Sequence, residues 1–309
     1  MIKAISFAIF LLVSVFGYAQ TKVSITIDDV PNTRQYYADG FRSKLLEQLD
    51  SLQIPIAIFI NEGLIAKNES IDENNELLNE WVAKPYITLG NHSYSHLRYS
   101  EVGVDSFKVD LLKGQTLTKQ LANQYAKLLQ YFRFPFNDLG KDKEQHLQMG
   151  RILDSLGYIN TPFTVESSDW MYSYIYDYYL EHGEQEQAKT IGERYVSTTL
   201  KYFQFFDSLA MKLYGRKVSQ TYLCHDNAMN AKYLPEILMQ LKDKQYQFVS
   251  LEQAMTDSVY SQKDLYHKKW GISWFYRWMD SQEERVKWMK AEPNTAEVDS
   301  LYNQLLNKK

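Results

Sequence analysis

Two histidines four residues apart, His92 and His96, are the first residues of this 309-residue chain whose spacing suggests chemistry. They follow the apolar run 86–89. On a helical turn, side chains at positions i and i+4 lie on one face, so both imidazoles could reach one metal ion. The pair alone is a weak signal, because a chain with six histidines can place two at this spacing by chance. A metal site would need further ligands from elsewhere in the chain.

Polar residues also follow the other apolar runs that we expect to be strands. They are Asp28-Asp29 after 23–27, Arg133 within 132–134, Asp169 after 158–165 and His225 after 220–223. In a parallel α/β protein the carboxyl ends of the strands form the binding face, so these side chains should meet there. Two imidazoles and one carboxylate make an open metal site that leaves a position for water. With a second carboxylate as base and a third histidine as acid, the set predicts metal-assisted hydrolysis of an acyl group.

Short apolar runs alternate with amphipathic helical patterns between residues 21 and 255, which predicts a parallel α/β sheet or barrel. The expected strands are 23–27, 56–60, 86–89, 132–134, 158–165, 220–223 and 246–249. The expected helices are 41–52, 73–82, 105–131 with a break near Gly114, 143–156, 171–217, 231–242 opened by Asn230, and 251–255. We expect one catalytic domain over 21–255 and an appended charged, helical segment over 256–309.

Residues 1–19 have the pattern of a secretory signal peptide. Lys3 precedes the apolar run 4–16, and the segment ends in Gly17-Tyr18-Ala19, a small-x-small cleavage pattern. The alternative is an uncleaved anchor, which the shortness of the apolar run disfavours. The interpretation therefore is a secreted or periplasmic protein with no integral membrane segment after cleavage.

Net charge and cysteine content argue against some binding partners and against a disulfide. The formal net charge of the chain is −4, and it becomes −5 without residues 1–19, because Lys3 is the one charged residue among them. A mildly acidic protein is not expected to bind nucleic acid or an anionic membrane as its main partner. The single cysteine, Cys224, rules out an intramolecular disulfide, and strand alternation should place it on the face opposite His225.

Five motifs resemble, in order, those of the polysaccharide deacetylases of the NodB-homology type, carbohydrate esterase family 4. They are Thr26-Ile27-Asp28-Asp29, His92-Ser93-Tyr94-Ser95-His96, Arg133-Phe134-Pro135-Phe136, Ser168-Asp169-Trp170 and Leu223-Cys224-His225. Five motifs in the family's order are far more specific than any one of them. The resemblance covers residues 21–255 and implies a distorted (β/α) barrel, with 256–309 as a C-terminal helical extension.

The resemblance implies a metal centre and a base. Asp29, His92 and His96 would bind one divalent ion, with zinc as the first expectation and cobalt, nickel or manganese as alternatives. Asp28 would be the catalytic base, and Arg133 would orient it and keep it ionised.

The remaining motif residues would complete the site. His225 would be the general acid, tuned by Asp169. Trp170 and Leu223 would form the apolar wall of the acetyl pocket, and the backbone N–H of Phe136 would help to hold the oxyanion. The chain departs from the family pattern at three positions, where Ile27 replaces Phe, Phe136 replaces Tyr and Glu166 replaces Asp.

The implied reaction is removal of acetyl groups from an N-acetylated glycan of the peptidoglycan or chitin type. An O-acetyl xylan or other carbohydrate esterase is an alternative, and so is a glycan-binding protein that has lost catalysis. Trp270, Trp274 and Trp278 recur every four residues and form either a sugar-stacking platform or, as we expect, a buried helical stripe. Three histidines match no motif, and these are His146, His182 and His267.

Overall fold

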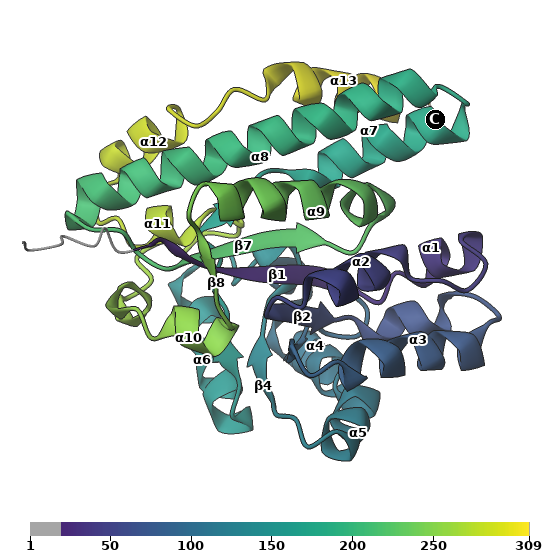
Figure 1. Ribbon diagram of the computed structural model, residues 1–309. Helices are drawn as coiled ribbons and strands as arrows, with labels where there is room; N and C mark the ends of the chain where they lie inside the picture. Colours follow the sequence, from purple (N-terminus) through teal and green to yellow (C-terminus); the bar gives the residue numbers. More distant parts are fainter. Residues whose placement is uncertain (1–19, 309) are drawn as a thin grey trace, which may run out of the picture.

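Eight parallel strands form one curled sheet in the computed structural model, which describes residues 20–308 (Figure 1). The strand order is β5-β4-β3-β2-β1-β7-β6, and β8 pairs with β1. The strands are β1 (Lys22–Val30), β2 (Ile56–Ile60), β3 (Ile87–Asn91), β4 (Leu129–Phe132), β5 (Ile159–Asn160), β6 (Val165–Glu166), β7 (Gln220–His225) and β8 (Gln247–Phe248). The predicted parallel α/β architecture is confirmed, whereas the signal-peptide prediction lies outside the described residues.

Helices surround the sheet. The α-helices are α1 (Thr33–Ala38), α2 (Lys44–Leu52), α3 (Ile71–Ala83), α4 (Tyr99–Lys113), α5 (Thr116–Gln124), α6 (Lys143–Leu156), α7 (Asp169–Glu181), α8 (Gln185–Tyr214), α9 (Ala228–Asp243), α10 (Leu251–Met255), α11 (Trp274–Arg277), α12 (Gln282–Met289) and α13 (Ala296–Leu306). Three short 3-10 helices are η1 (Glu62–Lys67), η2 (Pro135–Asn137) and η3 (Ser258–Ser261). Helices α7, α8 and α9 lie together beside β7, and α13 packs on α7 (Figure 1).

Much of the high tyrosine content serves the core. Tyr172, Tyr195 and Tyr222 are fully buried, and their hydroxyls are paired. The Tyr195 hydroxyl donates to Asn230 Oδ1 at 2.8 Å and lies 2.7 Å from the Tyr222 hydroxyl, while Tyr172 donates to Thr198 Oγ1 at 3.1 Å. Buried tyrosine is stable where its hydroxyl finds such a partner. These tyrosines therefore fill the space between α7, α8 and β7.

The C-terminal extension is helical and shares this core. Val259, Phe275, Val298 and Leu305 belong to the same buried apolar cluster as strands β1 and β2. No strand occurs among the described residues after β8, as expected. The division of the chain at residue 255 stays a prediction.

Several expected elements differ in their bounds. The strand expected over 132–134 is β4, which ends at Phe132, so Arg133 follows it, and the helix expected over 41–52 is α2, which begins at Lys44. The helix expected over 105–131 is two helices, α4 and α5, which separate at Gly114 as predicted, and the segment 171–217 is also two helices, α7 and α8. The single strand expected over 158–165 is wrong, because β5 and β6 are separated by a stretch that contains Pro162, which has no N–H for a ladder bond. Helix α9 begins earlier than expected, since Asn227, and not Asn230, is the N-cap and accepts the backbone N–H of Asn230 at 2.7 Å.

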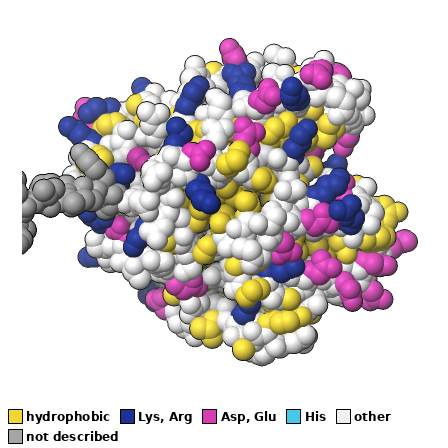
Figure 2. Space-filling view, viewed as in Figure 1, with side chains coloured by type: hydrophobic (Ala, Val, Ile, Leu, Met, Phe, Trp, Pro, Cys, Tyr) yellow, Lys and Arg dark blue, Asp and Glu magenta, His cyan; other side chains and the backbone are white. Residues whose placement is uncertain are grey.

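Charged side chains of both signs are interspersed over the surface, and Figure 2 shows this on the face that carries α8 and α9. None of the helices formed by residues 20–308 combines the length and the hydrophobicity that a membrane-spanning helix needs.

Candidate functional site

Asp28 and Asp29 reach the same cavity although they are neighbours on β1. In a regular strand, successive side chains point to opposite faces. Here the β1–β2 register shifts between Ile27 and Val30, and Asp29 has a left-handed φ of 58°. Such a bulge re-aims a side chain, and aspartate tolerates this conformation better than most residues. Both carboxylates therefore line one cavity at the carboxyl end of β1.

His92 and His96 lie on a loop after β3, so the expected helical turn is wrong. Ser93 and His96 both have positive φ, at 64° and 55°. The rings nevertheless come together, with their centroids 5.1 Å apart. The carboxylate of Asp110 on α4 accepts the backbone N–H of Ser95 at 3.0 Å and thereby fixes the loop. Gly114 lets the α4–α5 junction approach, because a Cβ there would lie 2.3 Å from the carbonyl carbon of Ser93.

The side chains of Asp29, His92 and His96 form a group that could hold a metal ion. Asp29 Oδ1 lies 3.4 Å from His96 Nε2 and 3.8 Å from His92 Nε2. Zinc ligands at 2.0–2.2 Å from a tetrahedral ion would be separated by about 3.3–3.6 Å, so the observed spacing fits. His92 Nδ1 donates to the carbonyl of Arg133 at 2.7 Å, which leaves Nε2 as the free lone pair. Burial lowers the pKa of His96 to about 4 despite the opposing effect of Asp29, so this ring is neutral as a ligand requires.

Asp28 is held behind the Asp29–His92–His96 group by a buried ion pair. Arg133 Nη1 donates to Asp28 Oδ1 at 2.7 Å and to Thr26 Oγ1 at 2.8 Å, and both charged side chains are almost fully buried. The guanidinium also lies 4.1 Å from the ring centroid of Phe59. Asp28 Oδ2 points to the ligand group, 3.9 Å from His92 Nε2. Arg133 thus contacts the Asp28 carboxylate on the side away from the cavity and does not line the cavity itself.

His225 and Asp169 form a second pair on the other side of the cavity. Asp169 is fully buried at the start of α7, and its Oδ1 accepts His225 Nδ1 at 2.7 Å. Its Oδ2 accepts the backbone N–H of His225 and the Nδ2 of Asn230, each at 2.8 Å. Burial by itself would lower the pKa of His225, but the charge and hydrogen bond of Asp169 raise it to about 10. His225 is therefore an imidazolium at neutral pH, and it lines the cavity.

The sequence matches a known family over its first half. The family model for polysaccharide deacetylase matches residues 18–150, which contain the metal-ligand group, the Asp28–Arg133 pair and Phe136. This match covers 133 of the 309 residues. No curated protein matched the chain.

Solved structures confirm the deacetylase fold. The polysaccharide deacetylase Bc1974 from Bacillus cereus aligns with a TM-score of 0.50 at 20% identity, over 75% of this chain and 92% of that one. A mutant of BA3943, a CE4 family pseudoenzyme from Bacillus anthracis, aligns with the same TM-score at 16% identity, over 76% of this chain and 67% of that one. The curled parallel sheet is thus the distorted (β/α) barrel that the motifs implied.

The cavity that is lined by Asp28, Asp29 and His225 has a volume of about 680 Å³, in the range of small-ligand sites. Most of the residues singled out from the sequence line it, and these are Asp28, Asp29, His92, His96, Phe136, Trp170, Leu223 and His225. The other two, Arg133 and Asp169, lie behind Asp28 and His225. All ten are therefore brought together in one region. Cys224 is buried in the core and does not line the cavity, as strand alternation predicts.

Glu166 does not support Arg133, although it occupies the position of a family aspartate. Its Oε1 accepts the backbone N–H of Ser168 at 2.5 Å, and the side chain lines the cavity. Arg133 instead donates to the carbonyls of Thr161 and Pro162, at 3.5 and 3.4 Å. Burial, and then the charge of Asp169, raise the pKa of Glu166 to about 8. At neutral pH this carboxyl is mostly protonated and can donate a hydrogen bond into the cavity.

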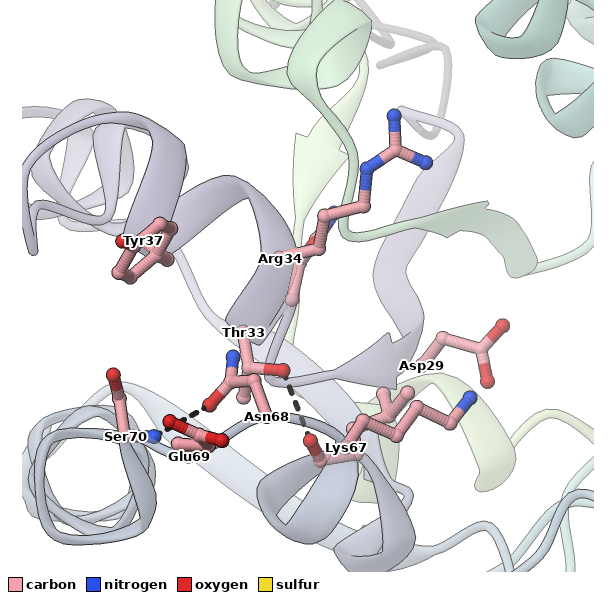
Figure 3. Close-up of a pocket in the computed structure, with 10 residues that line it drawn as sticks. Asp29, Thr33, Arg34, Tyr37, Lys67, Asn68, Glu69 and Ser70 are labelled. Atoms are coloured by element: carbon pink, nitrogen blue, oxygen red, sulfur yellow. Dashed lines mark hydrogen bonds between the residues drawn. The ribbon is translucent and has the colours of Figure 1, made fainter.

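A second pocket, of about 790 Å³, lies beside the cavity that contains Asp28 and His225, and it shares Asp29 with that cavity. Figure 3 shows Lys67 extending along this pocket toward Asp29, with Arg34 and Tyr37 on the opposite wall. Burial raises the pKa of Asp29, but the charges of His96, His92 and His225, and then that of Lys67, together hold it below its ordinary value. The carboxylate of Asp29 thus lies between this polar pocket and the side chains of His92 and His96.

Several residues of the site were not found from the sequence. Asp110, Asn230 and Tyr302 carry no motif, because each acts through a contact that links distant parts of the chain. The tryptophan stripe is also wrong as a helical feature, since Trp270 precedes α11 and lines the cavity whereas Trp278 is buried. The repeat of tryptophans was visible in the sequence, but only the fold separates the cavity-lining Trp270 from the buried Trp278.

Proposed function

We propose that this protein is a metal-dependent deacetylase that removes acetyl groups from an N-acetylated glycan of the peptidoglycan or chitin type. The observation that carries the proposal is the meeting, in one cavity, of three metal-ligating side chains, a carboxylate backed by arginine and an imidazolium backed by aspartate. Export by residues 1–19, a catalytic domain over 21–255 and a helical extension over 256–309 belong to the same proposal.

The proposed mechanism divides the work between the two faces of the cavity. A divalent ion held by Asp29, His92 and His96 would make a water molecule more acidic and polarise the acetyl carbonyl. Asp28 accepts the proton of the attacking water, and Arg133 orients its carboxylate by donating to Oδ1. His225 then gives its proton to the leaving sugar nitrogen, so the amine departs uncharged and acetate is released.

The apolar side chains define where the acetyl group lies. Leu223 is buried and lines the cavity next to His225, and Trp170 is the following residue of the Asp169 motif. Together they offer a wall on which a methyl group loses its hydration. The backbone N–H of Phe136 is proposed to donate to the developing oxyanion.

We expect the purified protein to bind one divalent ion and to release acetate from N-acetylated oligosaccharides. The ligand variant His92→Ala should lose both the ion and acetate release, because the two remaining ligands hold a metal far more weakly. Metal content is measured by mass spectrometry of the desalted protein, and acetate by an enzyme-coupled assay with zinc, cobalt, nickel or manganese added.

The matched control is His182→Ala, which removes an exposed histidine that lies at the end of α7 and does not line the cavity. It should keep wild-type metal content and activity. Turnover of O-acetyl xylan but of no amide would replace the proposal by an esterase. If no acetylated glycan is turned over with any of these metals, the remaining function is glycan binding alone.

The pH dependence of acetate release should report on His225. Because its folded pKa of about 10 lies above the ordinary 6.5, the pairing with Asp169 stabilises the fold fully below about pH 6.5, and this stabilisation is lost as the pH rises through 10. We expect Asp169→Asn to shift the alkaline limb of kcat to lower pH by at least about one unit, because the imidazolium loses its anion. An unchanged alkaline limb in pH-rate profiles would contradict the role of His225 as acid.

A further inference from the structure

One wall of the deacetylase cavity is aromatic and comes from outside residues 18–150. Trp170 stands at the start of α7, while Trp270 and Tyr302 belong to the C-terminal extension. The extension returns over α7, where α13 lies along that helix (Figure 1). Segments far apart in the sequence therefore combine to form this wall.

The segment that carries Trp270 is held in place by contacts of the residues that follow it. The Ser273 hydroxyl donates to the carbonyl of Thr164 at 2.7 Å, and the Trp274 N–H donates to the carbonyl of Phe163 at 3.0 Å. Gly271 lies so close to the next motif that a Cβ there would be 2.3 Å from the carbonyl oxygen of Phe136. The segment before α11 is thus fitted against the deacetylase motif that ends in Phe136.

Tyr302 fixes the opposite end of the wall. Its ring contacts the ring of Trp170 edge to face, with centroids 5.4 Å apart, and the ring of Tyr174 at 5.1 Å. These contacts orient the Trp170 indole, because perpendicular aromatic pairs have a preferred geometry. Helix α13 therefore positions a residue of the Ser168-Asp169-Trp170 motif.

The rings of the wall remain exposed where other aromatic residues of the same segment are buried. Trp270 is 58% exposed and Trp170 is 47% exposed, whereas Trp278 is only 6% exposed. An exposed indole forgoes the stabilisation that burial of its apolar surface would bring, so two such rings at one cavity indicate a ligand surface. Polar side chains, including Glu166 and Asn227, line the same cavity. Aromatic faces beside hydrogen-bonding groups suit a pyranose ring, whose C–H faces are apolar and whose edge carries hydroxyls.

We propose that Trp270 forms a binding subsite for the pyranose ring next to the acetylated sugar, so that the C-terminal extension makes the enzyme select oligosaccharides over single sugars. The inference rests on the proposed function for the identity of the neighbouring sugar. Trp270 supplies the stacking face of this subsite, while Tyr302 orients Trp170 beside the acetyl group.

The test compares one substrate that reaches this subsite with one that does not. For a tetramer of N-acetylglucosamine, Trp270→Ala should raise KM about five- to fiftyfold, because a stacking face is lost. For a small aryl acetate, kcat/KM should stay at the wild-type value. Trp270→Phe keeps an aromatic face and should restore most of the affinity.

The matched control is Trp288→Ala, the same substitution in the same extension, at a half-buried residue of α12 that does not line the cavity. It should leave KM for the tetramer unchanged. Calorimetric binding of the tetramer to the metal-free protein gives a second readout, in which Trp270→Ala should lower the affinity by a similar factor. Wild-type tetramer affinity of Trp270→Ala in calorimetry overturns the subsite, whether or not the protein is active. Absence of acetate release by the wild type overturns the proposed function instead.

Discussion

Replacing Asp28 by asparagine should lower kcat for acetate release by about 10²- to 10⁴-fold, the usual contribution of a general base. Asparagine keeps the size of the side chain and can still accept the hydrogen bond from Arg133, but it cannot take a proton from water. Metal content should stay at the wild-type value, because the ligand group is Asp29, His92 and His96. The measurement is acetate release under saturating substrate together with metal analysis of the same sample.

Asp50→Asn is the matched control for this substitution. Asp50 pairs with Lys84 at 2.6 Å on a different part of the molecule, so the variant loses a carboxylate without touching the cavity. We expect its kcat to equal that of the wild type. A variant Asp28→Asn with more than a tenth of the wild-type kcat and full metal content would show that another group is the base.

Removing Arg133 should be the most destabilising single substitution in the site. Arg133→Met leaves the buried carboxylate of Asp28 without its cation, and breaking a buried pair in this way costs about 3–5 kcal/mol. Urea unfolding monitored by circular dichroism measures the loss in the free energy of unfolding.

A double-mutant cycle separates the lost pair from lost packing. The variant Arg133→Met/Asp28→Asn has no uncompensated charge, so it should be more stable than Arg133→Met alone. If the two single effects simply add, the Asp28–Arg133 contact does not contribute to stability in the way the geometry indicates.

The candidate metal site shows how far sequence reasoning reached. The resemblance to the family motifs implied Asp29, His92 and His96 as ligands, and the structure places their ligand atoms together. The expected helical turn was wrong because the conformation of the loop after β3 depends on contacts with Asp110 and Gly114. Both of these residues belong to a later part of the chain, α4 and the junction that follows it. Local spacing cannot reveal contacts of this kind.

Glu166 and Trp270 are residues whose surroundings the sequence did not predict. Glu166 occupies a motif position, yet its partner is the backbone of Ser168 and not Arg133. Trp270 belongs to a regular repeat of tryptophans, yet it lines the cavity while Trp278 is buried. Tryptophans at a regular spacing thus have different surroundings, and only the packing of the extension against the sheet decides which of them is buried.

The sequence by itself determined the class of fold and the chemical groups of the site. Alternating apolar runs and helices specify a parallel sheet through hydrophobic periodicity, and polar residues after the strands must then gather at one edge. Tertiary structure alone decided how Asp28 and Asp29 face one cavity, which carbonyls hold Arg133 and which aromatic residues of the extension surround the ligand group. The physical reason is that these arrangements depend on a bulge and on long-range packing contacts, and neither leaves a periodic signal in the chain.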